Sequence, residues 1–147
     1  MKTNQMELTF DAKSVNESFA RVAVAAFLTD LNPTLDEIAD IKTAVSEAVT
    51  NAVIHGCKST EEQIHLYCKL RCDTKGNLVE IIVQDYGVGI PDIKKAMEPF
   101  FTTRPELERS GMGFAFMEAF MDELEVESGI NEGTKITMRK YIGKRDG

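Results

Sequence analysis

The chain has 147 residues, of which 43% are hydrophobic and 28% charged, proportions that fit one globular domain over residues 1–147 and leave little room for a second. No apolar run reaches the ~20 residues that span a bilayer, and the N-terminus lacks the apolar segment of a signal peptide, so we expect a cytoplasmic protein without a membrane partner. The net charge of −7 and the absence of a basic patch argue against direct binding of nucleic acid.

The first part of the sequence predicts one strand followed by two helices. Residues 6–12 alternate between apolar and polar side chains, which is the pattern of a strand with one buried face. Residues 14–17 and 34–37 both have the form of a capping box, in which two side chains three residues apart bond each other's backbone N–H groups. We expect a helix over 19–31 and a second that begins after the later box and ends with Gly56 as its C-terminal cap.

The rest of the chain predicts two hairpins, with an irregular, proline- and glycine-bearing segment between them. The expected elements are strands over 63–71 and 78–84, helices over 93–98 and 113–121, and strands over 124–128 and 134–141. This order favours an α+β fold: a two-layer α/β sandwich with an antiparallel or mixed, mostly antiparallel sheet and helices on one face.

Three polar side chains lie four residues apart on the second expected helix: Glu47, Asn51 and His55. Residues at this spacing share one face of a helix, and here their neighbours are small or apolar. Burying a polar group without a partner costs roughly 1–3 kcal/mol. The side chains therefore either pair within the protein, which is the more common arrangement, or face a polar ligand.

Two glycine-bearing loops follow that helix. In the first, Asp85 offers acceptor oxygens to an amino group, while Gly87 and Gly89 allow a flat or phosphate-bearing ligand to approach the backbone. A simple β-turn is the alternative interpretation. The second loop precedes a helix, whose N-terminal N–H groups favour phosphate. This second loop is not a P-loop, and no strand directly precedes it as the Rossmann pattern requires. This second loop consists of Ser110, Gly111, Met112 and Gly113.

These features occur together in a recognisable order. A helix with Glu-x3-Asn is followed by D-x-G-x-G, a Pro-Phe-Phe-Thr-Thr segment, G-x-G before a helix, and Gly-Thr in the last hairpin. In order and spacing the chain resembles the GHKL ATPase/kinase superfamily, which has the Bergerat ATP-binding fold. Within it, residues 46–56 and 101–114 resemble the anti-sigma serine kinases of endospore-forming bacteria. The resemblance covers essentially the whole chain.

The resemblance implies that ATP and Mg²⁺ are the ligands. Asn51 matches the Mg²⁺-binding asparagine, which is reasonable because Mg²⁺ takes few protein ligands beside triphosphate and water. Glu47 matches the general base that accepts a proton from the attacking hydroxyl. Asp85 matches the aspartate that binds the adenine amino group, and Thr134 the threonine that supports it. The nucleotide-binding loops would include Gly87, Gly89, Ser110, Gly111, Met112 and Gly113.

The segment between the two loops matches the part of the family that covers the triphosphate. An arginine there could stabilise charge on the transferred phosphoryl group. The sequence does not choose between its two arginines, and a solvated loop face is the alternative for both. The matching residues are Thr102, Thr103, Arg104 and Arg109.

The first helix is the expected partner surface. Glu17 and Arg21 are four residues apart and could simply form a surface ion pair. By resemblance, this helix contacts both a sporulation sigma factor and an anti-anti-sigma protein, and the protein forms a homodimer. An acidic protein suits a basic sigma factor. His55 is interpreted as structural, because phosphorylated histidines of the superfamily belong to a separate helical domain.

The three cysteines have two interpretations. Cys68 and Cys72 fall on one face of an expected strand, and Cys57 follows the second helix. No second pair of metal ligands lies nearby in the sequence, so we expect buried or half-exposed thiols and hold a metal site as the alternative.

The implied function is that of a switch protein with two activities. It would hold a sporulation sigma factor inactive while ATP and Mg²⁺ are bound, and would phosphorylate a serine of the anti-anti-sigma protein. Two alternatives keep the nucleotide site. One is an ATP-gated binding module without phosphotransfer, and the other is a related general-stress anti-sigma serine kinase with different partners.

Overall fold

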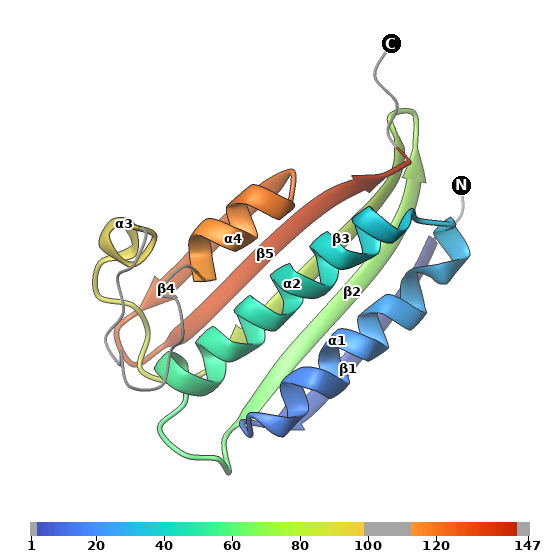
Figure 1. The fold of residues 1–147 in the computed structure, drawn as a ribbon. Coiled ribbons are helices and arrows are strands. Elements are labelled where there is room, and N and C mark those ends of the chain that lie inside the picture. Colours follow the sequence, from blue (N-terminus) through green and yellow to red (C-terminus); the bar gives the residue numbers. More distant parts are fainter. Residues whose placement is uncertain (1–2, 99–112, 144–147) are drawn as a thin grey trace.

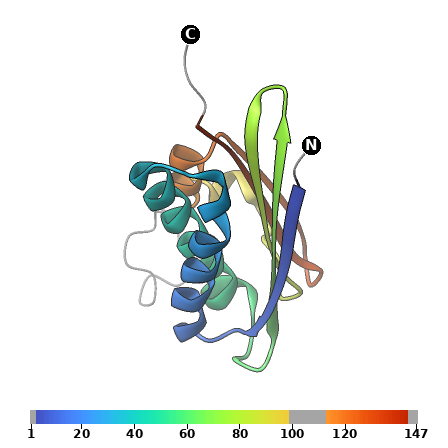
Figure 2. The same cartoon turned by 90° about the vertical axis from the view of Figure 1, so that its right-hand side faces the viewer.

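The computed structural model describes residues 3–98 and 113–143, and it has two layers (Figures 1 and 2). The helices α1, α2 and α4 cover one face of the sheet, with α2 between the other two. The elements are β1 (Thr3–Asp11), α1 (Val15–Phe27), the 3-10 turn η1 (Leu28–Leu31), α2 (Leu35–Asn51), the π-helical turn η2 (Ala52–Gly56), β2 (Gln63–Asp73), β3 (Gly76–Asp85), α3 (Ile93–Ala96), α4 (Gly113–Phe120), β4 (Glu123–Gly129) and β5 (Gly133–Ile142).

The sheet confirms the expected α+β fold. Its five described strands have the order β1-β2-β3-β5-β4. All four pairings are antiparallel, so of the two sheet types that the sequence left open the described strands form the antiparallel one. The hairpin β2–β3 and the hairpin β4–β5 were both expected. The pairing of β3 with β5 is non-local, and it sets Asp85 directly opposite Thr134.

The core lies between the sheet and the helices, as the sequence periods require. Alternate residues of the central strands point toward the helices, and the small residues of α2 let the helix lie close to them. The side chains that form this core are almost completely buried. They include Ile64, Leu66, Ile81, Val83, Ile136 and Met138 from the sheet, and Ile41, Ala44, Val45, Ala48 and Val49 from α2.

Only one of the two expected capping boxes forms. Thr34 Oγ1 accepts from the Glu37 N–H at 3.1 Å, and Glu37 Oε1 accepts from the Thr34 N–H at 2.9 Å, so this box is confirmed. The expected box at Ser14 is wrong. Ser14 has helical dihedrals rather than the extended ones that aim a cap side chain at the first turn, and its hydroxyl makes no capping hydrogen bond. Asn16 instead donates to the Asp11 carbonyl at 2.9 Å.

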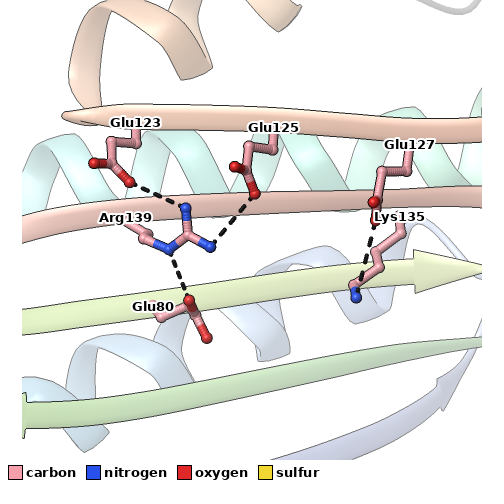
Figure 3. A network of polar contacts seen from close by, with 6 residues as sticks. All are labelled: Glu80, Glu123, Glu125, Glu127, Lys135 and Arg139. Carbon is pink, nitrogen blue, oxygen red and sulfur yellow. Dashed lines mark hydrogen bonds and ion pairs between the residues drawn. The ribbon is translucent and has the colours of Figure 1, made fainter.

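The face of the sheet away from the helices carries an ion-pair network centred on Arg139 (Figure 3). Its Nε donates to Glu80 at 2.7 Å, while Nη1 and Nη2 donate to Glu123 and Glu125 at 3.0 and 3.4 Å. Hydrogen bonds to Glu80 and Glu123 raise the pKa of Arg139 further above its usual range. One guanidinium thus ties β5 to both of its neighbours, β3 and β4, by side-chain bonds that supplement the backbone ladder.

The confirmed capping box leads to a stability prediction, because Glu37 also accepts from the Gly143 N–H through Oε2 at 2.8 Å. Partial burial raises the pKa of Glu37, but the hydrogen bonds from Thr34 and Gly143 outweigh it and lower the pKa overall. Glu37→Gln should lower the free energy of unfolding by about 1 kcal/mol at neutral pH. Urea denaturation of the wild type and the variant measures this difference.

The lowered pKa fixes how this difference depends on pH. A carboxylate whose pKa is lower in the folded state stabilises the fold above its unfolded pKa, and this contribution disappears as pH falls through the folded pKa. The gap between wild type and Glu37→Gln should therefore close on acidification. Asp36→Asn, which neutralises an exposed neighbour in the same first turn, is the control. An equal effect of both substitutions would contradict a specific role for Glu37.

Candidate functional site

The polar residues that the sequence singled out on α2 lie close to its end. Glu47 and Asn51 occupy the last two turns and are partly buried, next to the fully buried Ala48. The helix does not end as expected. It widens into the π-helical turn η2, in which the Cys57 N–H donates to the Ala52 carbonyl at 2.8 Å. The prediction that Gly56 is the C-terminal cap is wrong, because Gly56 is the last residue of η2 and Cys57 is its cap; Gly56 has no positive φ.

Gly56 has a different physical role, which is to let the end of the helical layer touch the sheet. A Cβ at this position would lie 2.4 Å from Asp85 Oδ2, and a Cβ at Gly87 would lie 1.8 Å from the Gly56 carbonyl oxygen. That carbonyl accepts from the Val88 N–H at 2.9 Å. The chain after α2 and the chain after β3 are therefore packed backbone against backbone, at a spacing that only glycine permits.

Asp85 ends β3 and is only 2% exposed. The pKa of its carboxyl group is raised, mainly because of burial. Hydrogen bonds from the backbone of Gly87 and Thr134 lower this pKa, whereas the negative charge of Glu62 raises it. The Gly87 N–H donates to Asp85 Oδ1 at 3.0 Å. A carboxylate has about four acceptor positions, so these two N–H groups leave capacity for a donor from a ligand. Such a buried acceptor beside glycine backbone fits an amino group on a flat ring.

The loop after Asp85 is also joined to the turn of the β4–β5 hairpin. Gly89 has a φ of +78°, and a Cβ there would lie 2.0 Å from the Gly129 carbonyl oxygen. The Val88 carbonyl accepts from the Asn131 N–H at 2.8 Å, and the Ile90 N–H donates to Ser128 Oγ at 2.6 Å. The structure thus brings together four of the expected nucleotide-site residues: Asp85, Gly87, Gly89 and Thr134.

Ser128 is a residue of this site that the sequence interpretation missed. Its hydroxyl contacts Thr134 Oγ1 at 2.9 Å and the Gly133 carbonyl at 3.0 Å. The expected hairpin across residues 129–133 already contained the signal, because it sets 128 beside 134. Gly56 was noticed only as a possible cap, and its contact with Asp85 has no signature in the sequence.

Several expected site residues fall on a part of the chain that lies outside the described residues. Gly113 is described and begins α4, which packs against α2. The proposed roles of the others therefore stay predictions. They are Thr102, Thr103, Arg104, Arg109, Ser110, Gly111 and Met112.

The expected partner surface on α1 is a partly exposed ion pair beside exposed apolar side chains. Arg21 Nη1 lies 3.7 Å from Glu17 Oε1. Val15, Phe19 and Val22 of the same helix are exposed by 73%, 56% and 59%. Ala20 and Val24 hold the helix against the core. The exposed residues therefore contribute little to the fold and are available to another protein.

The histidines and cysteines give no metal centre among residues 3–98 and 113–143, where no group of three or more possible ligands is placed to hold an ion. Burial raises the pKa values of both Cys57 and Cys68 to about 12, which keeps them as thiols. The Cys72 thiol donates to Asn77 Oδ1 at 2.7 Å. His55 lies in η2, and His65 Nδ1 lies 3.2 Å from the Thr9 hydroxyl.

No helix of the described ranges is long and apolar enough to cross a membrane.

Comparison with known proteins gives consistent matches over nearly the full length. Residues 8–140 match the histidine kinase-like ATPase domain. The anti-sigma F factor of Clostridium novyi is 56% identical over 142 residues, 97% of each chain. The anti-sigma F factor of Thermoanaerobacter pseudethanolicus is 59% identical over 96% of each chain, and that of Geobacillus kaustophilus is 55% identical over 96% of this chain and 94% of its own.

A solved structure has a similar fold. The RsbU and RsbW domains of a Mycobacterium tuberculosis protein match with a TM-score of 0.66 and 23% sequence identity. The match covers 95% of this chain and 32% of that one. At this identity the likeness concerns the fold alone.

The close contact at Gly56 predicts an unusual mutational effect. Glycine to alanine inside a helical turn normally stabilises a protein by up to about 1 kcal/mol. Gly56→Ala should instead destabilise it by about 1–3 kcal/mol, because the added methyl group overlaps the Asp85 carboxylate. Chemical denaturation measures whether the free energy of unfolding rises or falls. Gly143→Ala, which introduces a Cβ at a positive φ with no atom within 4 Å, separates backbone strain from crowding. A Gly56→Ala protein more stable than the wild type would contradict the contact.

Proposed function

The chain belongs to the histidine kinase-like ATPase domains, and within them to the anti-sigma F factors; from this premise we propose that it is a cytoplasmic, single-domain, ATP-dependent anti-sigma factor and serine kinase. It binds a sporulation sigma factor and holds it inactive. It also phosphorylates a serine of an anti-anti-sigma protein, so that transcription is controlled by exchange of partners.

The observation that carries the nucleotide part of this proposal is the buried Asp85 carboxylate between glycine backbones. Its acceptor positions fit the amino group of adenine, and the absence of side chains at Gly56, Gly87 and Gly89 fits a flat ring close to the chain. Asn51, on the last turn of α2, would hold Mg²⁺ through its amide oxygen, since Mg²⁺ prefers oxygen ligands and few of them from protein.

Glu47 would act one turn earlier as the general base. ATP would supply its γ-phosphoryl group and leave as ADP, and the attacking group would be the hydroxyl of the partner's serine. Glu47 accepts the proton that this hydroxyl loses, which requires it to lie within hydrogen-bond reach or one water away. Glu47 is partly buried and is followed in α2 by the fully buried Ala48. The expected cover of the triphosphate is Thr102, Thr103, Arg104 and Arg109, with Ser110, Gly111, Met112 and Gly113 at its end.

The exposed side of α1 supports the partner part of the proposal. Glu17 and Arg21 offer a charged pair and Phe19 an exposed aromatic ring, a combination common in protein interfaces. The net charge of −7 suits a basic sigma factor. We propose that sigma factor and anti-anti-sigma protein both bind at this helix, and that the active form is a homodimer.

Substitution of Glu47 distinguishes a kinase from an ATP-gated binding module. Glu47→Gln should retain ATP affinity within about threefold but reduce phosphotransfer by at least 10²-fold, the usual contribution of a general base. Transfer of label from γ-labelled ATP to the serine of a purified anti-anti-sigma protein measures the rate, and equilibrium titration measures affinity. Glu61→Gln, which changes an exposed glutamate outside the site, is the control.

Asn51→Ala should abolish the Mg²⁺-dependent part of ATP binding.

The outcome that removes the kinase proposal is full phosphotransfer by Glu47→Gln, or no transfer by the wild type with any anti-anti-sigma substrate. Label on the protein's own histidine would contradict it as well. Unchanged, Mg²⁺-dependent ATP binding by Asn51→Ala would show that this end of α2 does not face the nucleotide.

The raised pKa of Asp85 predicts how ATP affinity depends on pH. Only the ionised Asp85 carboxylate has its full acceptor capacity, so ATP affinity should fall when acidification protonates it. Because burial raises the pKa of Asp85, this loss should occur at a higher pH than for an ordinary aspartate. Calorimetric titration with ATP between neutral and mildly acidic pH measures this loss. Asp85→Asn, which stays neutral throughout, should bind weakly and without this pH dependence. The same acid dependence in Asp85→Asn would assign it to another group.

A further inference from the structure

Ser128 stands at a junction of three chain segments beside the candidate site. Its Oγ accepts from the Ile90 N–H at 2.6 Å, lies 3.0 Å from the Gly133 carbonyl oxygen and 2.9 Å from Thr134 Oγ1. Through these contacts Ser128, on β4, connects the loop after β3 with the first two residues of β5. Within the described residues, neither the resemblance nor the proposed reaction gives this serine a role.

The three contacts determine the direction of every hydrogen bond. A serine hydroxyl has one proton and two acceptor positions. The Ile90 N–H can only donate, so it occupies one acceptor position of Ser128. The Gly133 carbonyl can only accept, so it takes the single proton of Ser128. The remaining acceptor position of Ser128 must then receive the proton of Thr134, because no other arrangement makes all three contacts hydrogen bonds.

This assignment leaves Thr134 with acceptor positions only. Thr134 is 4% exposed and lies directly opposite Asp85 on the neighbouring strand, so the two side chains share the face of the sheet toward the helices. Asp85, as a carboxylate, also only accepts. Two adjacent acceptors favour a ligand group that donates, and they repel a ligand group that is itself an acceptor.

We infer that Ser128 is a specificity-determining positioning residue: by taking the proton of Thr134 it keeps this end of the site free of hydroxyl donors and so selects a 6-amino purine over a 6-oxo purine. This inference rests on the proposed nucleotide site and adds to it the residue that sets its hydrogen-bond polarity. Ser128 acts through Thr134 and is not itself assigned a contact with the nucleotide.

Removal of the Ser128 hydroxyl should therefore change selectivity rather than only affinity. In Ser128→Ala the Thr134 hydroxyl loses its acceptor and can turn its proton toward the ligand. Inosine triphosphate has an oxygen at C6 in place of the amino group of ATP, and that oxygen can accept this proton. We expect the ratio of ATP affinity to inosine triphosphate affinity to fall roughly tenfold, the effect of about one hydrogen bond. Equilibrium titration of the full chain with each nucleotide and Mg²⁺ gives the ratio.

Three further variants test the Ser128 hydroxyl and the route through Thr134. Ser128→Thr retains a hydroxyl and should retain the wild-type ratio. Thr134→Val removes the hydroxyl that turns, so adding Ser128→Ala to Thr134→Val should leave the ratio unchanged, as a double-mutant cycle requires for residues that act as one unit. Ser14→Ala, which removes a hydroxyl that makes no capping bond in α1, is the control for the loss of any serine. Thermal unfolding of each variant confirms that it is folded.

The possible results separate this inference from the proposed function. If the wild type binds ATP and Ser128→Ala weakens both nucleotides equally, the serine is only structural and the inference is overturned while the ATP site stands. If Ser128→Ala changes the ratio equally with and without the Thr134 hydroxyl, the route through Thr134 is overturned. A wild type that binds neither nucleotide overturns the proposed function, and the inference with it.

Discussion

The approach of the Gly56 backbone to the Asp85 carboxylate is the contact on which the candidate site depends. It is possible because neither Gly56 nor Gly87 has a side chain, and the space that a Cβ would need is already filled. Through it the end of α2, with Glu47 and Asn51 in its last turns, is held against the end of β3. Without that contact, nothing at this point would hold the polar residues of the helix close to the Asp85 carboxylate of the sheet.

The same contact has an energetic consequence for Asp85. Removing a carboxylate from water is costly, and its raised pKa reflects this, yet the Gly87 and Thr134 backbone N–H groups return only part of the lost hydration. A core position without a ligand-binding role would be better filled by an apolar residue. The burial of the Asp85 carboxylate is therefore evidence of a different kind from sequence similarity, and it supports the proposal of a ligand that donates a hydrogen bond.

The sequence predicted what local periodicity and end signals determine. The four-residue spacing of Glu47 and Asn51 placed them on one helix face, and the Thr34 capping box was confirmed. The α+β fold followed from the order of strands and helices. The expected box at Ser14 failed, because a capping motif states only which side chains could cap, whereas the backbone entering α1 was already helical there.

What the sequence missed depends on contacts between distant segments. The β3–β5 pairing joins strands that are about 50 residues apart and fixes Asp85 opposite Thr134; a register shifted by one residue would turn Thr134 to the other face. Ser128 contacts Gly133 and Thr134 across its own hairpin, but it contacts Ile90 only because the loop after β3 packs against that hairpin. Gly56 contacts Asp85 only where α2 ends against β3. The expected hairpin already placed Ser128 beside Thr134, whereas the contacts of Ser128 with Ile90 and of Gly56 with Asp85 have no local pattern in the sequence.

The helical layer separates the two surfaces that the proposed function needs. α2 lies between α1 and α4, so α1, the proposed partner helix, flanks the helix that carries Glu47 and Asn51 (Figure 1). The Glu17–Arg21 pair is partly exposed, and such pairs stabilise a fold by well under 1 kcal/mol. A partner can therefore replace that ion pair with its own contacts at little cost to the fold, whereas Asp85 and Thr134, both buried, cannot change partners without moving the backbone around them.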